Sequence, residues 1–183
     1  MNNKLFISDF TGVLAIVCHD AGATNLILPW LRACSDNKLH VIMQGPAKQL
    51  WESAYPNISI LNNLYGALKG ADKLLTGTGW GSNIEHDARQ YAQENKIYSI
   101  AVIDHWVNYK ERFIRDDKII LPDELWVVDE YALHEAKNFF PQKKIKLRPN
   151  TYLKEQVNFI NRCKRLSPLE ILYVCSQLFR IGS

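Results

Sequence analysis

The feature that most limits how this chain can fold is a series of short, mostly apolar runs rich in β-branched residues. These runs lie at residues 14–18, 40–43, 58–61, 73–76, 100–103, 125–128 and 171–174. Most are continuously apolar, without polar residues at alternate positions, which is typical of strands covered on both faces. Stretches with helical spacing separate several of the runs. Strands that alternate with helices predict right-handed crossovers and therefore a parallel sheet.

The helical stretches carry apolar residues at intervals of three and four. One covers residues 23–33, although Pro29 falls inside it and favours a kink. Others cover residues 83–95 and 131–140. For 83–95 the spacing predicts an inner face of Ile84, Ala88, Tyr91 and Ala92 and an outer face of Glu85, Asp87, Arg89 and Gln93. The sequence predicts a Rossmann-like, doubly wound α/β fold, with helices on both faces of a mostly parallel sheet.

The length and composition fit one folded domain that ends near residue 160. The chain has 183 residues, of which 47% are hydrophobic and 22% charged, and this balance argues against disorder. The interval from Asn161 to Pro168 is polar, basic and contains proline. We therefore interpret residues 1–160 as the Rossmann-like domain and 161–183 as a linker followed by a strand. That strand either completes the first sheet or opens a second domain.

Charge and cysteine usage narrow the class of partner and the compartment. The net charge is +3, which is too small an excess to indicate nucleic-acid binding, because phosphate recognition needs clustered cations. The basic residues at 143–148 and 162–165 are interpreted as a solvated face. The four cysteines show no paired spacing, so we expect reduced thiols and a cytoplasmic protein. We expect no transmembrane segment, because no apolar run approaches the roughly 18 residues that a span requires.

Ligands of open parallel sheets bind beyond the carboxyl ends of the strands, so the residues after each run are candidate site residues. The first run is followed by His19, Asp20 and Gly22. Gly22 permits a tight turn, and the helix start beyond it offers free backbone N–H groups that favour an anion. The spacing matches neither a dinucleotide fingerprint nor a phosphate loop. The alternative is that Asp20 or Thr24 only caps the helix.

A glycine-rich loop follows the run at 73–76. It contains three glycines together with Thr78, Trp80 and Ser82, just before a predicted helix. Glycines allow a ligand to approach the backbone closely, so we expect Thr78, Gly79, Trp80 and Ser82 to bind substrate. The alternative is a tight strand-to-helix turn in which Ser82 or Asn83 caps the helix.

The densest polar group follows the run at 100–103 and consists of Asp104, His105, Trp106, Asn108, Tyr109 and Arg112. Histidine titrates near neutral pH and an adjacent carboxylate can orient it, so Asp104 and His105 are the candidate catalytic residues. The rings of Trp106 and Tyr109 are expected to stack on a sugar or a base, and Asn108 and Arg112 to supply hydrogen bonds. The alternative is an aspartate cap followed by an aromatic helix face packed on the sheet.

The order of these loops resembles the N-terminal half of the GT-B glycosyltransferases and of the related sugar-nucleotide 2-epimerases. In that superfamily glycine-rich turns follow the first and a middle strand, and a polar group with His or Glu follows the next strand. Here those places hold Asp20-Ala21-Gly22, residues 76–82 and residues 104–108, and the resemblance covers roughly residues 14–150.

The resemblance implies an acceptor-side domain that acts in bacterial-type polysaccharide or glycoconjugate synthesis. Its ligand would be a sugar or a nucleotide sugar, and no resident cofactor or metal is implied. Asp104 or His105 would deprotonate the acceptor hydroxyl. Most nucleotide-binding residues of the family lie in a C-terminal half, for which this chain has no room. The resemblance therefore implies a second domain or a partner chain.

Two other classes of function stay open. A metal-dependent carbohydrate hydrolase or deacetylase would gather ligands from His19, Asp20, Asp104, His105 and Asp129. The GlcNAc deacetylases carry a His-Pro-Asp-Asp pattern after their first strand, whereas this chain has His19-Asp20-Ala21 and lacks the second acid. The third class is a non-catalytic module that binds a sugar, a nucleotide or another protein, including a second copy of the chain in a homo-oligomer.

Overall fold

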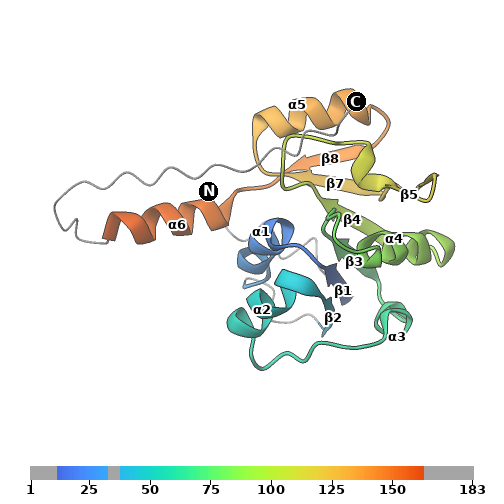
Figure 1. Ribbon diagram of the computed structural model, residues 1–183, viewed down its shortest axis with the longest axis horizontal. Coiled ribbons are helices and arrows are strands. Elements are labelled where there is room, and N and C mark those ends of the chain that lie inside the picture. Colours follow the sequence, from blue (N-terminus) through green and yellow to red (C-terminus); the bar gives the residue numbers. More distant parts are fainter. Residues whose placement is uncertain (1–11, 33–37, 163–183) are drawn as a thin grey trace, which may run out of the picture.

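The computed structural model describes residues 12–32 and 38–162, and its centre is a parallel sheet of six strands (Figure 1). The strands are β1 (Val13–Cys18), β2 (Lys38–Met43), β3 (Lys73–Thr76), β4 (Tyr98–Val102), β7 (Glu124–Val127) and β8 (Lys144–Leu147). Their order across the sheet is β2-β1-β3-β4-β7-β8, and every neighbouring pair is parallel. The predicted fold class is confirmed.

The predicted strand at 58–61 is wrong in extent, because the segment pairs with β2 at a single bridge between Val41 and Ile60. The Trp51 indole donates to the carbonyl of Ile58 over 3.1 Å, so that carbonyl bonds to a helix side chain. With this bridge counted as an edge position, the first six positions follow the 3-2-1-4-5-6 order of the Rossmann fold, and β8 adds a seventh at the other edge. The order reverses between β1 and β3, which is where such sheets bind ligands.

Helices cover both faces of the sheet. One face carries α1 (Ala21–Leu31), α2 (Gly45–Ala54) and α6 (Thr151–Arg162), and the other carries α3 (Leu64–Leu68), α4 (Ile84–Glu94) and α5 (Glu130–Phe139) (Figure 1). In β1 alternate residues point to opposite faces, so Leu14 and Ile16 pack with α1 while Ala15 and Val17 pack with α4. The helices predicted at 23–33, 83–95 and 131–140 correspond to α1, α4 and α5. Helices α2, α3 and α6 were not predicted.

The predicted outer face of α4 is wrong at two positions, because Glu85 and Arg89 are each only 1% exposed. Arg89 donates from Nη1 to the carbonyl of Gly77 and the hydroxyl of Thr76, and its guanidinium lies over the Phe113 ring. Phe113 belongs to the 3₁₀ turn Glu111–Phe113, which comes after β4. A hairpin of β5 (Ile114–Arg115) and β6 (Lys118–Ile119) follows this turn. Buried polar partners thus override the amphipathic pattern of the helix.

The basic residues near 145 do not form a simple solvated face, because they belong to the edge strand β8. Lys144 and Lys146 form ion pairs of 2.8 and 3.1 Å with the buried carboxylate of Glu124. Arg148 lies over the Trp126 ring, 4.0 Å from its centroid. Long cationic side chains cover apolar surface while their charges find partners. A row of lysines on an edge strand is therefore partly a packing feature.

The C-terminal predictions fall mostly outside the described residues. Helix α6 runs to Arg162, two residues into the predicted linker, and the rest of the linker and the predicted strand at 171–174 lie beyond it. Cys34, Cys163 and Cys175 also lie outside. Cys18 is fully buried, and burial raises the pKa of its thiol well above the usual range. In residues 12–32 and 38–162 no helix is both long enough and apolar enough to span a membrane.

Candidate functional site

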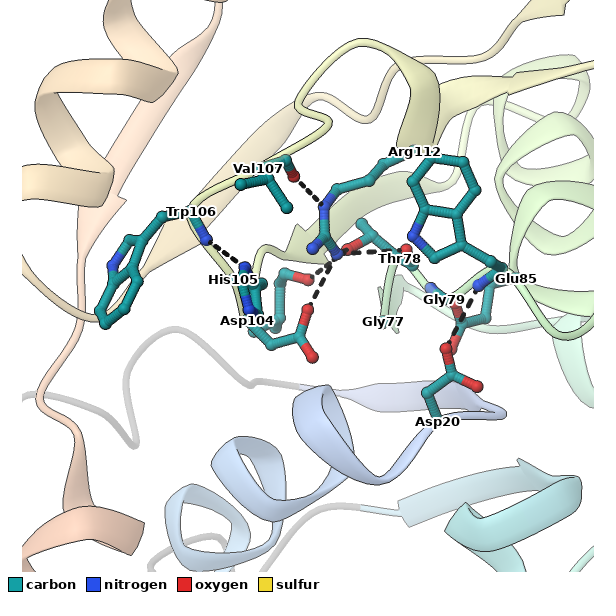
Figure 2. Close-up of polar contacts among 12 residues, drawn as sticks. Asp20, Gly77, Thr78, Gly79, Glu85, Asp104, His105, Trp106, Val107 and Arg112 are labelled. Carbon is teal, nitrogen blue, oxygen red and sulfur yellow. Dashed lines mark hydrogen bonds and ion pairs between the residues drawn. The ribbon is translucent and has the colours of Figure 1, made fainter. Parts of the chain in front are cut away.

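The loops that follow β1, β3 and β4 meet at the carboxyl edge of the sheet (Figure 2). Asp20, after β1, accepts a 3.2 Å hydrogen bond at Oδ2 from the backbone N–H of Trp80, after β3. Arg112 donates from Nη1 to the hydroxyl of Thr78 and to Oδ1 of Asp104, and so joins the loops after β3 and β4. Three segments that are far apart in sequence therefore form one connected polar cluster.

His19 and Asp20 form a carboxylate–imidazole pair next to this junction. The distance from His19 Nδ1 to Asp20 Oδ1 is 2.6 Å. An ionised carboxylate only accepts hydrogen bonds, so Nδ1 carries the proton and Nε2 is left as the acceptor nitrogen. Although Asp20 occupies the N-cap position of α1, its side chain makes no cap bond to the helix. The carboxylate of Asp20 therefore bonds to His19 and Trp80 and does not cap the helix.

Two glycines make room for the imidazole of His19. A Cβ atom on Gly45 would lie 2.6 Å from His19 Nε2, and a Cβ on Gly81 would lie 2.7 Å from Cε1. Gly45 also has φ of +48°, a conformation that disfavours other residues. Two further glycines leave room for carboxylates. A Cβ on Gly79 would collide with the carboxylate of Asp20, and a Cβ on Gly22 would collide with the carboxylate of Asp104. The glycines of the site serve close packing of its polar side chains.

Gly45→Ala is expected to lower the free energy of unfolding more than Gly70→Ala does. Both positions have positive φ, which costs about 1 kcal/mol for alanine. Gly70 has open space around it, whereas the added methyl at Gly45 must displace His19, at a further cost of about 1–2 kcal/mol. Urea unfolding measures both losses, and NMR signals of the His19 ring should move only in Gly45→Ala. Equal losses with unmoved ring signals would mean that Gly45 does not hold His19.

Glu85 ties the loops after β1 and β3 together, and sequence reasoning missed it. Its Oε1 accepts from the backbone N–H of His19 at 2.9 Å, and its Oε2 accepts from that of Gly79 at 2.6 Å. Burial raises the pKa of Glu85, although these two N–H groups and the nearby Arg89 act in the opposite direction. The helical pattern placed Glu85 outward, so only its position just after the glycine loop offered a signal.

Asp104 is held in place by Arg112, whose guanidinium is buried. The ion pair between Arg112 Nη1 and Asp104 Oδ1 measures 2.9 Å, and Arg112 Nε donates to the carbonyl of Val107 at 3.1 Å. The hydroxyl of Thr78, also buried, donates to the carbonyl of Val102. Arg112 and Thr78 thus bond to protein groups and position Asp104. They are framework residues of the site, and Asp104 is the group that they present at the start of α1.

Two tryptophans expose their rings at opposite ends of the cluster. Trp80 is 51% exposed and lies against Arg115, whose Nη2 donates to the carbonyl of Gly79 at 2.6 Å. Trp106 is 55% exposed, and its indole N–H donates to Asp129 Oδ2 at 2.8 Å. Each ring is therefore restrained on one side and accessible on the other. Such rings offer flat surfaces on which the apolar face of a ring-shaped ligand can stack.

The remaining predicted site residues take different positions. His105 is exposed, and its Nδ1 accepts from the backbone N–H of Trp106. Within residues 12–32 and 38–162 its hydrogen bond and its ring contact are both with Trp106, and neither is with His19 or Gly79. Asn108 is exposed, with φ of +60°. Tyr109 is only 1% exposed and stacks on Phe139, so its ring is not available to a ligand. Burial raises the pKa of Tyr109 to about 12.

Ser82 links the site to its surroundings. Its hydroxyl donates to Gln44 Oε1 at 3.2 Å, and it accepts from the backbone N–H of Ile84 at the start of α4. Ser82 therefore satisfies a free N–H group at the helix start, as the capping alternative predicted, and also connects the glycine loop to the end of β2.

The candidate metal ligands do not converge. Within residues 12–32 and 38–162 no group of three or more His, Cys, Asp or Glu side chains lies close enough to hold a metal ion. His19, Asp20, Asp104, His105 and Asp129 therefore provide no ligand set, and the metal-dependent hydrolase alternative is not carried further.

Comparisons with protein-family models, with curated protein sequences and with solved structures found no match. The function is therefore inferred from the geometry of the site.

Proposed function

We propose that the cluster at the ends of β1, β3 and β4 binds a sugar or a nucleotide sugar. We further propose that the chain is a GT-B-like acceptor-side domain acting in bacterial-type polysaccharide or glycoconjugate synthesis together with a second, nucleotide-sugar-binding domain. The observation that carries the proposal is the direct bonding of Asp20 to Trp80 and of Arg112 to Thr78 and Asp104. Those bonds unite the three loops on which the family resemblance rests.

The chemistry of the cluster suits a hydroxyl-rich ligand. The carboxylates of Asp20 and Asp104 are partly exposed and accept hydrogen bonds, so they fit the donors of sugar hydroxyl groups. The exposed faces of Trp80 and Trp106 fit the apolar faces of a pyranose ring or a base. The buried cations, Arg89 and Arg112, are bonded within the protein. The two accessible carboxylates therefore offer acceptors, and Arg115, which is only partly buried beside Trp80, adds a positive charge.

His19 is better placed than Asp104 or His105 to act as the general base of a transfer reaction. Asp20 fixes the tautomer of His19 and leaves Nε2 to accept the proton of an acceptor hydroxyl, while the oxygen attacks the sugar and the nucleotide leaves. Asp104 is engaged with Arg112, and His105 accepts a bond from the adjacent backbone at Nδ1. We therefore assign proton abstraction to His19, oriented by Asp20, and ligand binding to Asp104.

Asp20→Asn is expected to weaken ligand binding about tenfold or more, or roughly 1.4 kcal/mol. An amide has only one acceptor oxygen, so it can accept from the Trp80 N–H only if its NH₂ group faces His19 Nδ1. The proton of His19 then moves to Nε2, so the variant loses either the Trp80 bond or the acceptor nitrogen of His19. A thermal-shift screen first identifies a sugar or nucleotide sugar that raises the unfolding temperature, since a ligand that binds only the folded state must do so. Titration calorimetry with that ligand then measures the affinity of each variant.

Asp72→Asn is the matched control. Asp72 accepts a 2.7 Å bond from the backbone N–H of Val13 at the opposite end of β1, and an amide oxygen can replace it there. This variant should bind the ligand as the wild type does. If no sugar or nucleotide sugar stabilises the protein, or if both variants bind equally, the proposal fails.

A further inference from the structure

A separate cleft of about 640 Å³ lies beyond the carboxyl end of β2, next to the strand-end cluster. Its walls come from the start of α2, from residues 55–62 and from Ile84 at the start of α4. Clefts that hold small molecules typically measure roughly 300–1,000 Å³. The volume therefore suits a ligand of that size, and none of the site residues predicted from the sequence lines this cleft.

Residues 58–61 form part of the cleft wall and pair with β2 only at the bridge of Ile60. Past the bridge at Ile60, the backbone N–H of Leu61 donates to the carbonyl of Val41, and the segment then leaves the sheet edge. The wall at Tyr55 is fixed, because its hydroxyl donates to the carbonyl of Leu28 at 2.8 Å and its ring packs on Trp51. A wall held in this way keeps its shape before a ligand arrives, which lowers the entropic cost of binding.

The lining is polar but carries no net charge. Neutral hydrogen-bonding side chains come from Gln44, Ser59 and Asn62. The charged residues, Lys48 and Glu52, have opposite signs and lie 4.0 Å apart on successive turns of α2. A phosphate group would meet a single lysine already balanced by a carboxylate, whereas hydroxyl groups would meet donors and acceptors of both kinds.

Apolar surface alternates with these polar groups. Pro56, Ile58 and Ile60 contribute apolar atoms to the same cleft, and Tyr55 contributes an aromatic ring. Pyranose rings present C–H faces beside their hydroxyl groups, so a mixture of apolar surface and neutral amide or hydroxyl groups is complementary to them. A nucleotide would bring phosphate charges that this lining does not match.

We propose that this cleft is a second binding site, which holds an uncharged, hydroxyl-rich carbohydrate unit. Gln44 lines the cleft, and the next residue, Gly45, packs against the His19 ring of the strand-end cluster. The site goes beyond the proposed function, because that function concerns the strand-end cluster and does not require a second sugar subsite.

The test uses ¹H–¹⁵N correlation spectra of the chain with three kinds of probe. Glucose, galactose, mannose and N-acetylglucosamine represent neutral sugars, uridine diphosphate represents a charged nucleotide, and inorganic phosphate represents the anion alone. The neutral sugars are expected to shift the amide signals of Ser59, Leu61 and Asn62, and the two anions are expected to leave them in place.

Ser59→Trp fills the cleft from an exposed position and is expected to raise the dissociation constant of the sugar about tenfold or more. Asn62→Leu removes one hydrogen-bonding group without filling the space and should weaken binding less. An unchanged spectrum away from the cleft verifies that each variant is folded.

The outcomes separate this inference from the proposed function. If none of the four sugars shifts the cleft signals, or if uridine diphosphate or phosphate shifts them more strongly, the second site is excluded as described. A nucleotide sugar is added as a fourth probe for the strand-end cluster. Shifts in the cleft, with none at Gly79 or Trp80 from any sugar or nucleotide sugar, would keep the second site and remove the strand-end proposal. Shifts at Gly79 or Trp80 without shifts in the cleft would support the strand-end proposal and exclude the second site.

Discussion

Arg112→Met is expected to lower the free energy of unfolding by about 3 kcal/mol, because it leaves several buried groups without partners. Arg112 is almost fully buried and donates to Asp104 Oδ1, to the hydroxyl of Thr78 and to the carbonyl of Val107. Removing one member of a mostly buried ion pair leaves an uncompensated charge, which costs more than the pair itself contributes. The loops after β3 and β4 should also lose their connection, so ligand binding at the cluster should weaken.

Arg32→Met is the control for this variant. Arg32 pairs with Glu155 across α1 and α6, but its side chain is 55% exposed, and exposed pairs contribute about 1 kcal/mol or less. Urea unfolding of both variants at neutral pH measures the difference. Similar losses in the two variants would show that the guanidinium of Arg112 does not organise the site.

Glu124→Gln is expected to remove a pH-dependent part of the stability. Burial of Glu124 opposes its ionisation, but hydrogen bonds from Lys144, Trp126, Lys146 and Tyr98 outweigh burial and lower its pKa from 4.5 to about 2. Below pH 4.5 the unfolded chain therefore takes up a proton that the folded protein does not. Glu124 thus contributes stability that is complete above pH 4.5 and is lost as the pH falls through about 2.

The contribution of Glu124 is on the order of 2 kcal/mol, after allowance for solvent around the exposed Lys144. Glu124→Gln should be less stable than the wild type by this amount at neutral pH, and the gap should close on acidification. Denaturant unfolding measured from pH 7 to pH 2 tests both statements. A gap that stays constant over that range would mean that the carboxylate of Glu124 is not the group that titrates.

The sheet could be predicted from sequence because its strands are buried on both faces. Runs such as 14–18 and 100–103 are apolar throughout, which few other structures require. The run at 58–61 is also mostly apolar, but it contains the exposed Ser59 and pairs with β2 only at Ile60, while the carbonyl of Ile58 accepts from the indole of Trp51. A bond from a side chain to the backbone leaves no periodic trace in the sequence.

The site could be predicted in outline but not in its internal bonding. The carboxyl ends of parallel strands share one edge, which brings together the loops that carry His19, Gly79 and Asp104. His105 was expected beside His19 and Gly79, but it is exposed and bonds to the adjacent backbone. Periodicity misplaced Glu85, because a carboxylate that accepts two backbone N–H groups is stable in a buried position. Arg112 was expected to contact the ligand and is instead bonded within the protein, since the sequence does not show which polar groups satisfy each other.

Titration with the sugar or nucleotide sugar found by thermal shift, followed by ¹H–¹⁵N correlation spectra, locates the ligand on the sheet. The account predicts that the largest amide shifts fall at the carboxyl ends of the strands, at Gly22, Trp80 and Asp104. The opposite end of the sheet offers a competing hollow of about 280 Å³, lined by residues that include Lys73 and Lys144. The strand-end proposal is contradicted if the largest shifts fall at those two lysines. It is also contradicted if saturating ligand produces no shifts at the carboxyl ends of the strands.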